Sequence, residues 1–128
     1  DRLIVPYNQP KALPGVGSRV ILCKNRQIRV TNLLGITFMD GKSQNPFEAI
    51  DEVLDNDQSD IHIVDFHAEA TSEKVALGYY LDGKVSAVLG THTHVTTADE
   101  KILPKDMYER TYLKDEDCLE ILTFMGGG

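Results

Sequence analysis

The feature that most constrains the fold is a strand, helix, strand pattern in the middle of the chain. Residues 61–66 are an apolar run rich in β-branched side chains, residues 71–81 carry apolar positions at helical spacing, and residues 85–89 are a second apolar run. Two buried strands joined by a helix through short connections predict a right-handed parallel βαβ unit. The chain is therefore expected to have an α/β fold.

The central helix of this unit has start and stop signals. Thr71 or Ser72 can cap its first turn, and Asp82-Gly83 ends it. Its apolar positions are predicted to be its buried part. They are Val75, Ala76, Leu77, Tyr79 and Tyr80.

Further elements are predicted upstream. Residues 20–23 and 27–32 flank a polar turn, which predicts a β-hairpin with a loop of three or four residues. A helix is expected to begin at Asn45, where Asn45 can cap free amide groups and Pro46 suits the first helical position. The acidic residues in and after this helix are expected on its solvated face. They are Asp51, Glu52, Asp55, Asp57 and Asp60.

Three of the four histidines follow the two apolar runs of the βαβ unit. His67 comes directly after the first run, and His92 and His94 come just after the second. Residues i and i+2 of an extended chain point the same way, so His92 and His94 can present both imidazoles to one side. The carboxyl ends of parallel strands meet at the sheet edge where open α/β sheets bind ligands. The three rings are therefore expected to gather there and could bind zinc, manganese, iron or nickel.

Neighbouring residues are candidates to support or use such a site. Asp65 can orient an imidazole through its second nitrogen, while Glu69 can cap the following helix. Thr91 and Thr93 alternate with the histidines and can hydrogen-bond the loop or a substrate phosphate. His62 lies inside the strand and is expected to be structural. A His-x-His pair is also common as surface decoration, and its spacing alone leaves both interpretations open.

Composition excludes several classes of protein. The chain has 128 residues, a net charge of −7 and no apolar run near the roughly 20 residues needed to cross a bilayer. Its acidity argues against a groove for double-stranded nucleic acid, which requires a basic face. Two distant cysteines without a Cys-x-x-Cys spacing argue against a thiolate metal site. No signal-peptide pattern opens the sequence, so a cytoplasmic location is the default expectation.

Residues 65–74 and 90–99 closely resemble the corresponding motifs of the YmdB-like family of calcineurin-type metallophosphoesterases. The resemblance also covers residues 30–39 and, more weakly, 3–10, and it extends to about Pro104. It implies a layered α/β sandwich of the calcineurin-like type, present in part. The expected organisation is a metallophosphoesterase-like domain over residues 1–104, with an unassigned tail over 105–128 whose apolar stretch at 118–125 is a candidate last strand.

The family resemblance also implies a function. Its members are phosphodiesterases that act on cyclic nucleotides, including the 2′,3′-cyclic form, with two metal ions in one site. By this match His67 and His92 would be ligands of one metal and His94 of the other, with manganese or iron expected before zinc. The two ions would clamp a phosphodiester and activate a water for in-line attack. A small phosphodiester is the expected substrate, and self-association into a homo-oligomer stays open.

The chain departs from the family in one respect that bears on activity. The Gly-Asp, Asn-Gly-Glu-Asn and Gly-Asn-His segments, which supply the other metal ligands and the general-acid histidine, do not occur in these 128 residues. The chain is therefore expected to correspond to the C-terminal half of such an enzyme, with no catalytic general acid of its own identified. Two alternatives to the two-metal phosphodiesterase remain. One is a catalytically silent metal-binding or assembly module, and the other is a single-metal hydrolase that uses the three histidines alone.

Overall fold

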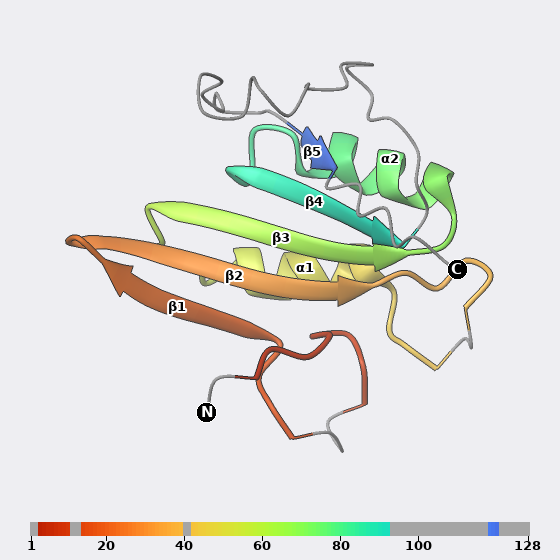
Figure 1. Ribbon diagram of the computed structural model, residues 1–128, viewed down its shortest axis with the longest axis horizontal. Helices are drawn as coiled ribbons and strands as arrows, with labels where there is room; N and C mark the ends of the chain where they lie inside the picture. The colour runs from red at the N-terminus through yellow and green to blue at the C-terminus, as the bar shows by residue number, and fades with distance from the viewer. Residues whose placement is uncertain (1–2, 11–13, 40–41, 93–117, 121–128) are drawn as a thin grey trace, which may run out of the picture.

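The computed structural model describes residues 3–10, 14–39, 42–92 and 118–120. They form one mixed sheet with the strand order β1-β2-β3-β4-β5, and two helices (Figure 1). The strands are β1 (Ser18–Cys23), β2 (Arg26–Leu34), β3 (Ile61–Ala68), β4 (Ala87–His92) and β5 (Cys118–Glu120). The helices are α1 (Pro46–Leu54) and α2 (Thr71–Leu81). This architecture confirms the predicted α/β class.

The first two strands form the predicted hairpin, but with a tighter turn. Cys23 pairs with Arg26 in an antiparallel ladder, so only Lys24 and Asn25 connect β1 to β2. Both have positive φ, 46° and 66°, as a two-residue type I′ turn requires. The predicted loop of three or four residues was therefore wrong, because Arg26 belongs to the strand.

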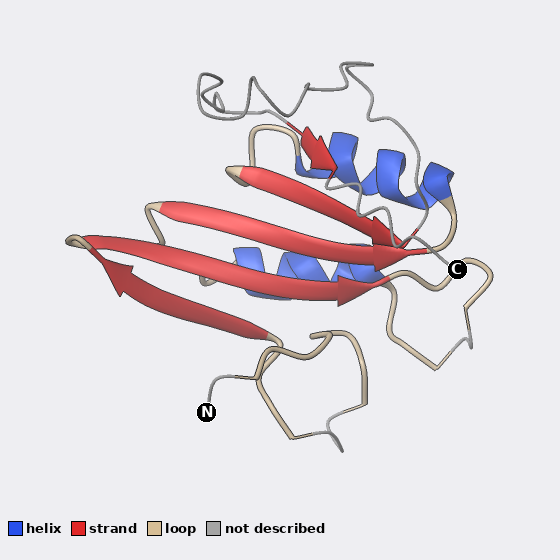
Figure 2. Cartoon of the chain, viewed as in Figure 1, coloured by secondary structure: helices blue, strands red, loops and turns tan. Residues whose placement is uncertain are grey.

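The next strands build two consecutive parallel units. β2 pairs in parallel with β3, and β3 with β4, with α1 and α2 as the crossover helices. Both helices cover the same face of the sheet (Figure 2), since their buried side chains share one cluster with alternate residues of β3. The central βαβ prediction is thus confirmed. Of the tail, β5 is parallel to β4 over three residues, where a last strand was a candidate.

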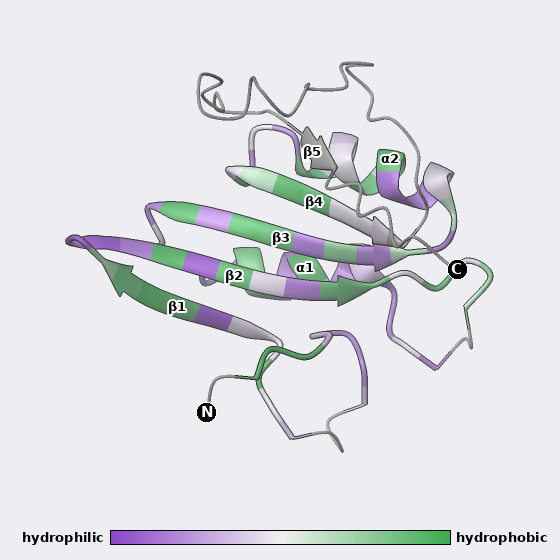
Figure 3. Ribbon diagram, viewed as in Figure 1, coloured by the Kyte–Doolittle hydropathy of each residue, from purple (hydrophilic) through white to green (hydrophobic). Residues whose placement is uncertain are grey.

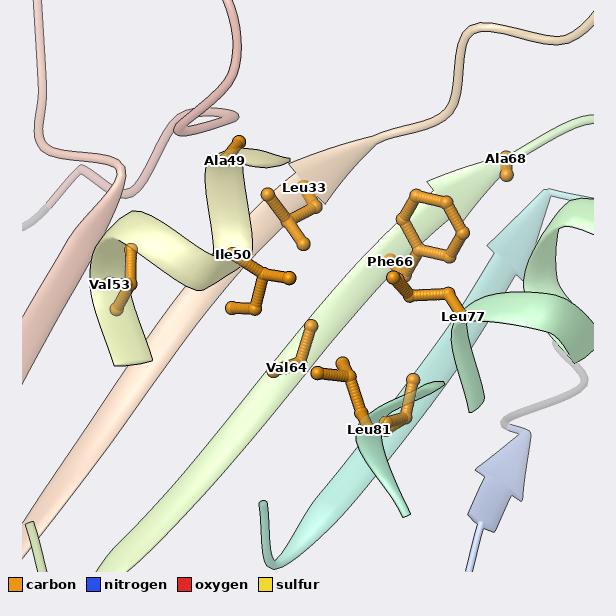
Figure 4. Packing of buried hydrophobic residues seen from close by; sticks show 10 residues of the cluster. Leu33, Ala49, Ile50, Val53, Val64, Phe66, Ala68, Leu77 and Leu81 are labelled. Carbon is orange, nitrogen blue, oxygen red and sulfur yellow. The ribbon is translucent and has the colours of Figure 1, made fainter. Parts of the chain in front are cut away.

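The hydrophobic core lies between this face and the two helices. Figure 4 shows side chains of α1, β2, β3 and α2 pointing into one cluster, with Phe66 at the carboxyl end of β3 among them. Fully buried Val64 and Phe66 alternate with Asp65 and His67, which lie on the opposite face of the sheet. The core therefore fixes which face of β3 carries its polar residues.

The predicted N-terminal cap is confirmed for α1 but not for α2. α1 begins as expected, with Pro46 in its first turn and the Phe47 amide donating to Asn45 Oδ1 at 2.9 Å. α2 spans the predicted residues and ends before Gly83, whose φ is +68°. However, its N-cap is Ala70, without a side-chain cap, so neither Thr71, Ser72 nor Glu69 caps it.

The buried side of α2 was predicted correctly only in part. Val75, Ala76 and Tyr79 are exposed. Leu77 is buried and Tyr80 packs against the core, as predicted, and the helix also buries Glu73, Lys74 and Leu81. The reason is that Glu73 and Lys74 have polar partners at the carboxyl edge of the sheet, which makes their burial tolerable.

His62 lies in a buried polar cluster near the amino end of β3, as its structural interpretation predicted. Its Nε2 is 2.8 Å from Thr31 Oγ1, which in turn is 2.8 Å from Ser18 Oγ. Its Nδ1 is 2.7 Å from Asp57 Oδ2, without the alignment of a hydrogen bond, and Asp57 Oδ1 accepts from Arg29 Nε at 2.8 Å. Asp57 is thus an ion-pair partner in a nearly buried site, which corrects its prediction as part of a solvated face.

This cluster predicts a pH-dependent stability. Burial lowers the pKa of the His62 imidazole below its ordinary 6.5, outweighing Asp57, which raises it, and Arg29 lowers it further. The unfolded chain therefore binds more protons than the folded chain between the two pKa values. The free energy of unfolding is expected to be fully retained above pH 6.5 and to fall as the pH drops from there toward the folded pKa.

Urea denaturation at about pH 7.5 and about pH 5.5 measures this effect. His62→Gln is expected to lower stability at the higher pH but to reduce the difference between the two pH values. An unchanged difference in His62→Gln would assign the pH dependence to other groups.

Candidate metal centre at the carboxyl edge of the sheet

The candidate site lies where the parallel strands end, with the His67 side chain on the face of the sheet opposite the helices. β3 runs to Ala68 and β4 to His92, so His67 and His92 are strand residues and do not follow the strands as predicted. The register pairs His67 with Thr91 and Ala68 with His92. The backbones that carry the two histidines are therefore adjacent at one edge of the sheet, as the sequence indicated.

The His67 imidazole is held by a neighbouring strand. Its Nδ1 lies 3.0 Å from Thr91 Oγ1, across the β3 to β4 pairing. His67 is half-buried, and so is Thr91. A hydroxyl that contacts one ring nitrogen restricts the orientation of the ring, as the carboxylates, backbone carbonyls and waters behind metal-bound histidines do.

A second polar pair lies one step back along the same face. Asn32 and Asp65 are paired in the β2 to β3 register, and Asn32 Nδ2 donates to Asp65 Oδ2 at 2.6 Å. Asp65 therefore engages Asn32, and the described contact to the His67 imidazole comes from Thr91. Figure 3 shows the hydrophilic colour at the carboxyl end of β3, where Asp65 and His67 lie.

The remaining predicted site residues are described in part or not at all. Glu69 is exposed just after β3. For His92 the structure gives the backbone position at the end of β4. Thr93 and His94 lie outside the described residues, so the expected gathering of three imidazoles stays a prediction. Among the described residues no group of three or more histidine, cysteine or acidic side chains is placed to hold a metal ion.

Sequence reasoning missed the two buried charged residues that border this edge. Glu73 accepts the backbone amides of Ile36 and Thr37, and Lys74 Nζ donates to the Thr91 carbonyl at 3.4 Å. Successive residues at the start of α2 thus reach the loop that follows β2 and the end of β4. The available signal was their position directly after the His67 segment, at the helix terminus that faces the strand ends.

A mixed α/β sheet with polar residues gathered at its carboxyl edge is the class of fold that binds ligands at strand ends. The profile described as YmdB-like protein matches residues 1–113, so the chain belongs to the YmdB-like family.

Two curated relatives show the same relationship. A protein of Bacillus subtilis (strain 168) named 2′,3′-cyclic-nucleotide 2′-phosphodiesterase is 47% identical over 105 residues, which are 80% of this chain and 39% of that protein. A putative phosphatase/phosphodiesterase of Mycoplasma pneumoniae is 48% identical over 92 residues, 71% of this chain and 33% of that protein. The chain therefore spans between a third and two-fifths of the length of these relatives.

Solved structures give the same fold. A hypothetical protein from Thermus thermophilus superposes with a TM-score of 0.70 at 39% identity, covering 91% of this chain and 42% of the other. A novel phosphatase from Mycoplasma pneumoniae superposes with a TM-score of 0.67 at 43% identity, covering 80% and 38%. The described residues thus share part of the fold of a phosphatase of the metallophosphoesterase type.

Neither of the two described helices has the length and apolar character of a membrane span.

Proposed function

We propose that this chain forms the histidine-bearing part of a two-metal phosphodiesterase that hydrolyses small phosphodiesters, with cyclic nucleotides as the substrate class. The observation that carries the proposal is the placement of His67 and His92 at the ends of adjacent parallel strands in a member of the YmdB-like family. A relative at 47% identity is named for activity on 2′,3′-cyclic nucleotides, which favours these compounds, with 3′,5′-cyclic AMP as a further candidate.

The donor chemistry of the described residues fits a metal ion. His67 offers an imidazole whose Nδ1 already contacts a hydroxyl, and Thr91 supplies that hydroxyl. His92 and His94 would complete the set, with manganese or iron as the expected ions and zinc as a further candidate. Such ions would bind the phosphate and activate a water for attack on phosphorus. The chain's own part is to hold the His67 imidazole in position through Thr91, whose carbonyl Lys74 contacts in turn.

A catalytically silent metal-binding or assembly module is the second candidate. It is favoured by one sequence observation, namely that the Gly-Asp, Asn-Gly-Glu-Asn and Gly-Asn-His segments do not occur in these 128 residues. Such a module would bind metal through its histidines without turning over a substrate. A single-metal hydrolase would show both metal and activity with one ion per chain.

The test is elemental analysis of the purified, unchelated chain, combined with hydrolysis of a chromogenic phosphodiester in the presence of added manganese. Two metals per chain with turnover would support the phosphodiesterase, and His67→Ala and His92→Ala are then expected to lose both. Metal without turnover would support the silent module. A chain without metal and without activity would contradict the proposed metal centre.

His62→Gln is the matched control, because it removes an imidazole from the far end of β3. It is expected to leave the metal content unchanged. Thr91→Val is expected to weaken metal binding about 10- to 100-fold by removing the hydroxyl behind His67, whereas Thr91→Ser keeps that hydroxyl and should retain affinity.

A further inference from the structure

A short loop after β2 lies beside the candidate metal centre. The Gly35 amide donates to the His67 carbonyl at 2.8 Å, so the loop begins next to the histidine-bearing end of β3. Residues 36–39 then turn, with the Met39 amide donating to the Ile36 carbonyl at 3.2 Å. Figure 1 shows the chain leaving β2 at the same end of the sheet as the arrowheads of β3 and β4. This is the edge at which an α/β sheet binds its ligand.

A buried carboxylate holds the base of this loop. Glu73 is only 8% exposed, and its two carboxylate oxygens accept the amides of Ile36 and Thr37 at 3.0 and 3.1 Å. Charge-assisted hydrogen bonds of this kind are stronger than those between neutral groups. Gly35 leaves space for the carboxylate, since a Cβ there would lie 2.6 Å from Glu73 Oε2. The loop conformation is thus fixed from α2.

The residue that this loop presents is Phe38. It has φ of +62°, a left-handed conformation that is unfavourable for a side chain with a Cβ. Its side chain is 81% exposed, so burial in the described core does not offset that cost. Single exposed hydrophobic residues are ordinary, but a large aromatic ring held outward in an unfavourable backbone conformation at a ligand-binding edge is a mark of function.

We propose that Phe38 is the base-contacting residue of the site, stacking its ring on the nucleobase of a cyclic nucleotide whose phosphate lies toward His67. The inference rests on the proposed function and adds to it the residue that contacts the base of the substrate. Aromatic stacking suits this role because every base offers a π-face, so purines and pyrimidines are both accepted. Glu73 acts through the loop and is a positioning residue.

The experiment compares the affinities of the chain for 2′,3′-cyclic AMP, ribose 2′,3′-cyclic phosphate and adenosine, measured by NMR titration. Phe38→Ala is expected to weaken binding of 2′,3′-cyclic AMP and adenosine by roughly 5- to 100-fold. Binding of ribose 2′,3′-cyclic phosphate, which has no base, should not change. Phe38→Tyr keeps the ring and is expected to retain affinity. Glu73→Gln, which lacks the charge that holds both amides, should weaken only the two ligands with a base.

Leu22→Ala is the matched control, because Leu22 is an exposed hydrophobic residue on the edge strand β1. Equal loss for ribose 2′,3′-cyclic phosphate, unchanged affinity for 2′,3′-cyclic AMP in Phe38→Ala, or no binding of adenosine by the wild-type chain would each overturn the inference. A change in sedimentation of Phe38→Ala without a change in affinity would assign the ring to self-association and overturn it as well. If Phe38→Ala weakened binding of only the two ligands with a base, and the chain held no metal, the proposed metal-dependent function would be contradicted while the role of Phe38 would be supported.

Discussion

Asn8→Ala is expected to lower the free energy of unfolding by roughly 2–4 kcal/mol, a large share of the stability of a domain this size. Asn8 is 2% exposed and makes three hydrogen bonds to backbone. Its Nδ2 donates to the carbonyls of Leu34 and Gln44 at 2.7 and 2.9 Å, and its Oδ1 accepts the Leu34 amide at 2.9 Å. It therefore links the last residue of β2 to the segment that leads into α1. Alanine would leave these backbone groups without their partner.

Urea denaturation monitored by circular dichroism measures this loss. Asn56→Ala is the matched control, since Asn56 is exposed after α1 and its replacement should change stability by no more than about 0.5 kcal/mol. If Asn8→Ala were as stable as Asn56→Ala, the amide of Asn8 would not be the link between these segments.

Much of the fold could be predicted because its signals are local. The hairpin, the α1 cap at Asn45 and the strand, helix, strand order all depend on short-range patterns of turn residues, caps and apolar spacing. The predicted strand ends, at Phe66 and Leu89, fall short of the observed ones, because polar histidines are typical of loops. Ladder partners on neighbouring strands, which a single sequence does not show, extend both strands.

The missed features are those in which a polar side chain is buried because distant chain satisfies it. Asn8 stands between prolines in a stretch whose composition predicts an irregular loop, yet Leu34 and Gln44 make it a buried link. Glu73 and Lys74 stand in the polar first turn of α2, yet they are buried against the loop and strand ends. Burial of such groups depends on partners 17 to 37 residues away, and no local period encodes it.

The candidate site was predictable to the same extent. Placing His67 and His92 at one edge required only that their strands be parallel neighbours, which the sequence indicated. The sequence offered Asp65 as the residue that orients an imidazole, and Thr91 as a partner of the loop or of a substrate phosphate. The Thr91 contact with His67 depends on a register that only the structure gives. Asn32, paired with Asp65, is what distinguishes the roles of these two residues.

Gly35→Ala is expected to be the substitution that most directly links stability to the site. A Cβ at Gly35 would lie 2.6 Å from Ala68 Cβ and 2.6 Å from Glu73 Oε2, distances at which something must move. Overpacking of this kind costs about 1–3 kcal/mol and occasionally more, and here the carboxylate would also lose its amide partners. We therefore expect a loss of about 3 kcal/mol in the free energy of unfolding, measured by urea denaturation.

A Cβ at position 35 would contact both Ala68 and Glu73, and a second substitution separates the two effects. Ala68→Gly in the Gly35→Ala background removes one of the two 2.6 Å contacts and is expected to restore part of the lost stability, since neighbouring substitutions are not additive. The contact with Glu73 would remain, so the amides of Ile36 and Thr37 should still exchange with solvent faster than in the wild-type chain. Full recovery of both stability and amide protection would show that Ala68 alone requires a glycine at position 35. Recovery of stability without amide protection would instead locate the remaining defect at the carboxylate that fixes the Phe38 loop, so one glycine would serve both the packing of β3 and the shape of the proposed base-binding edge.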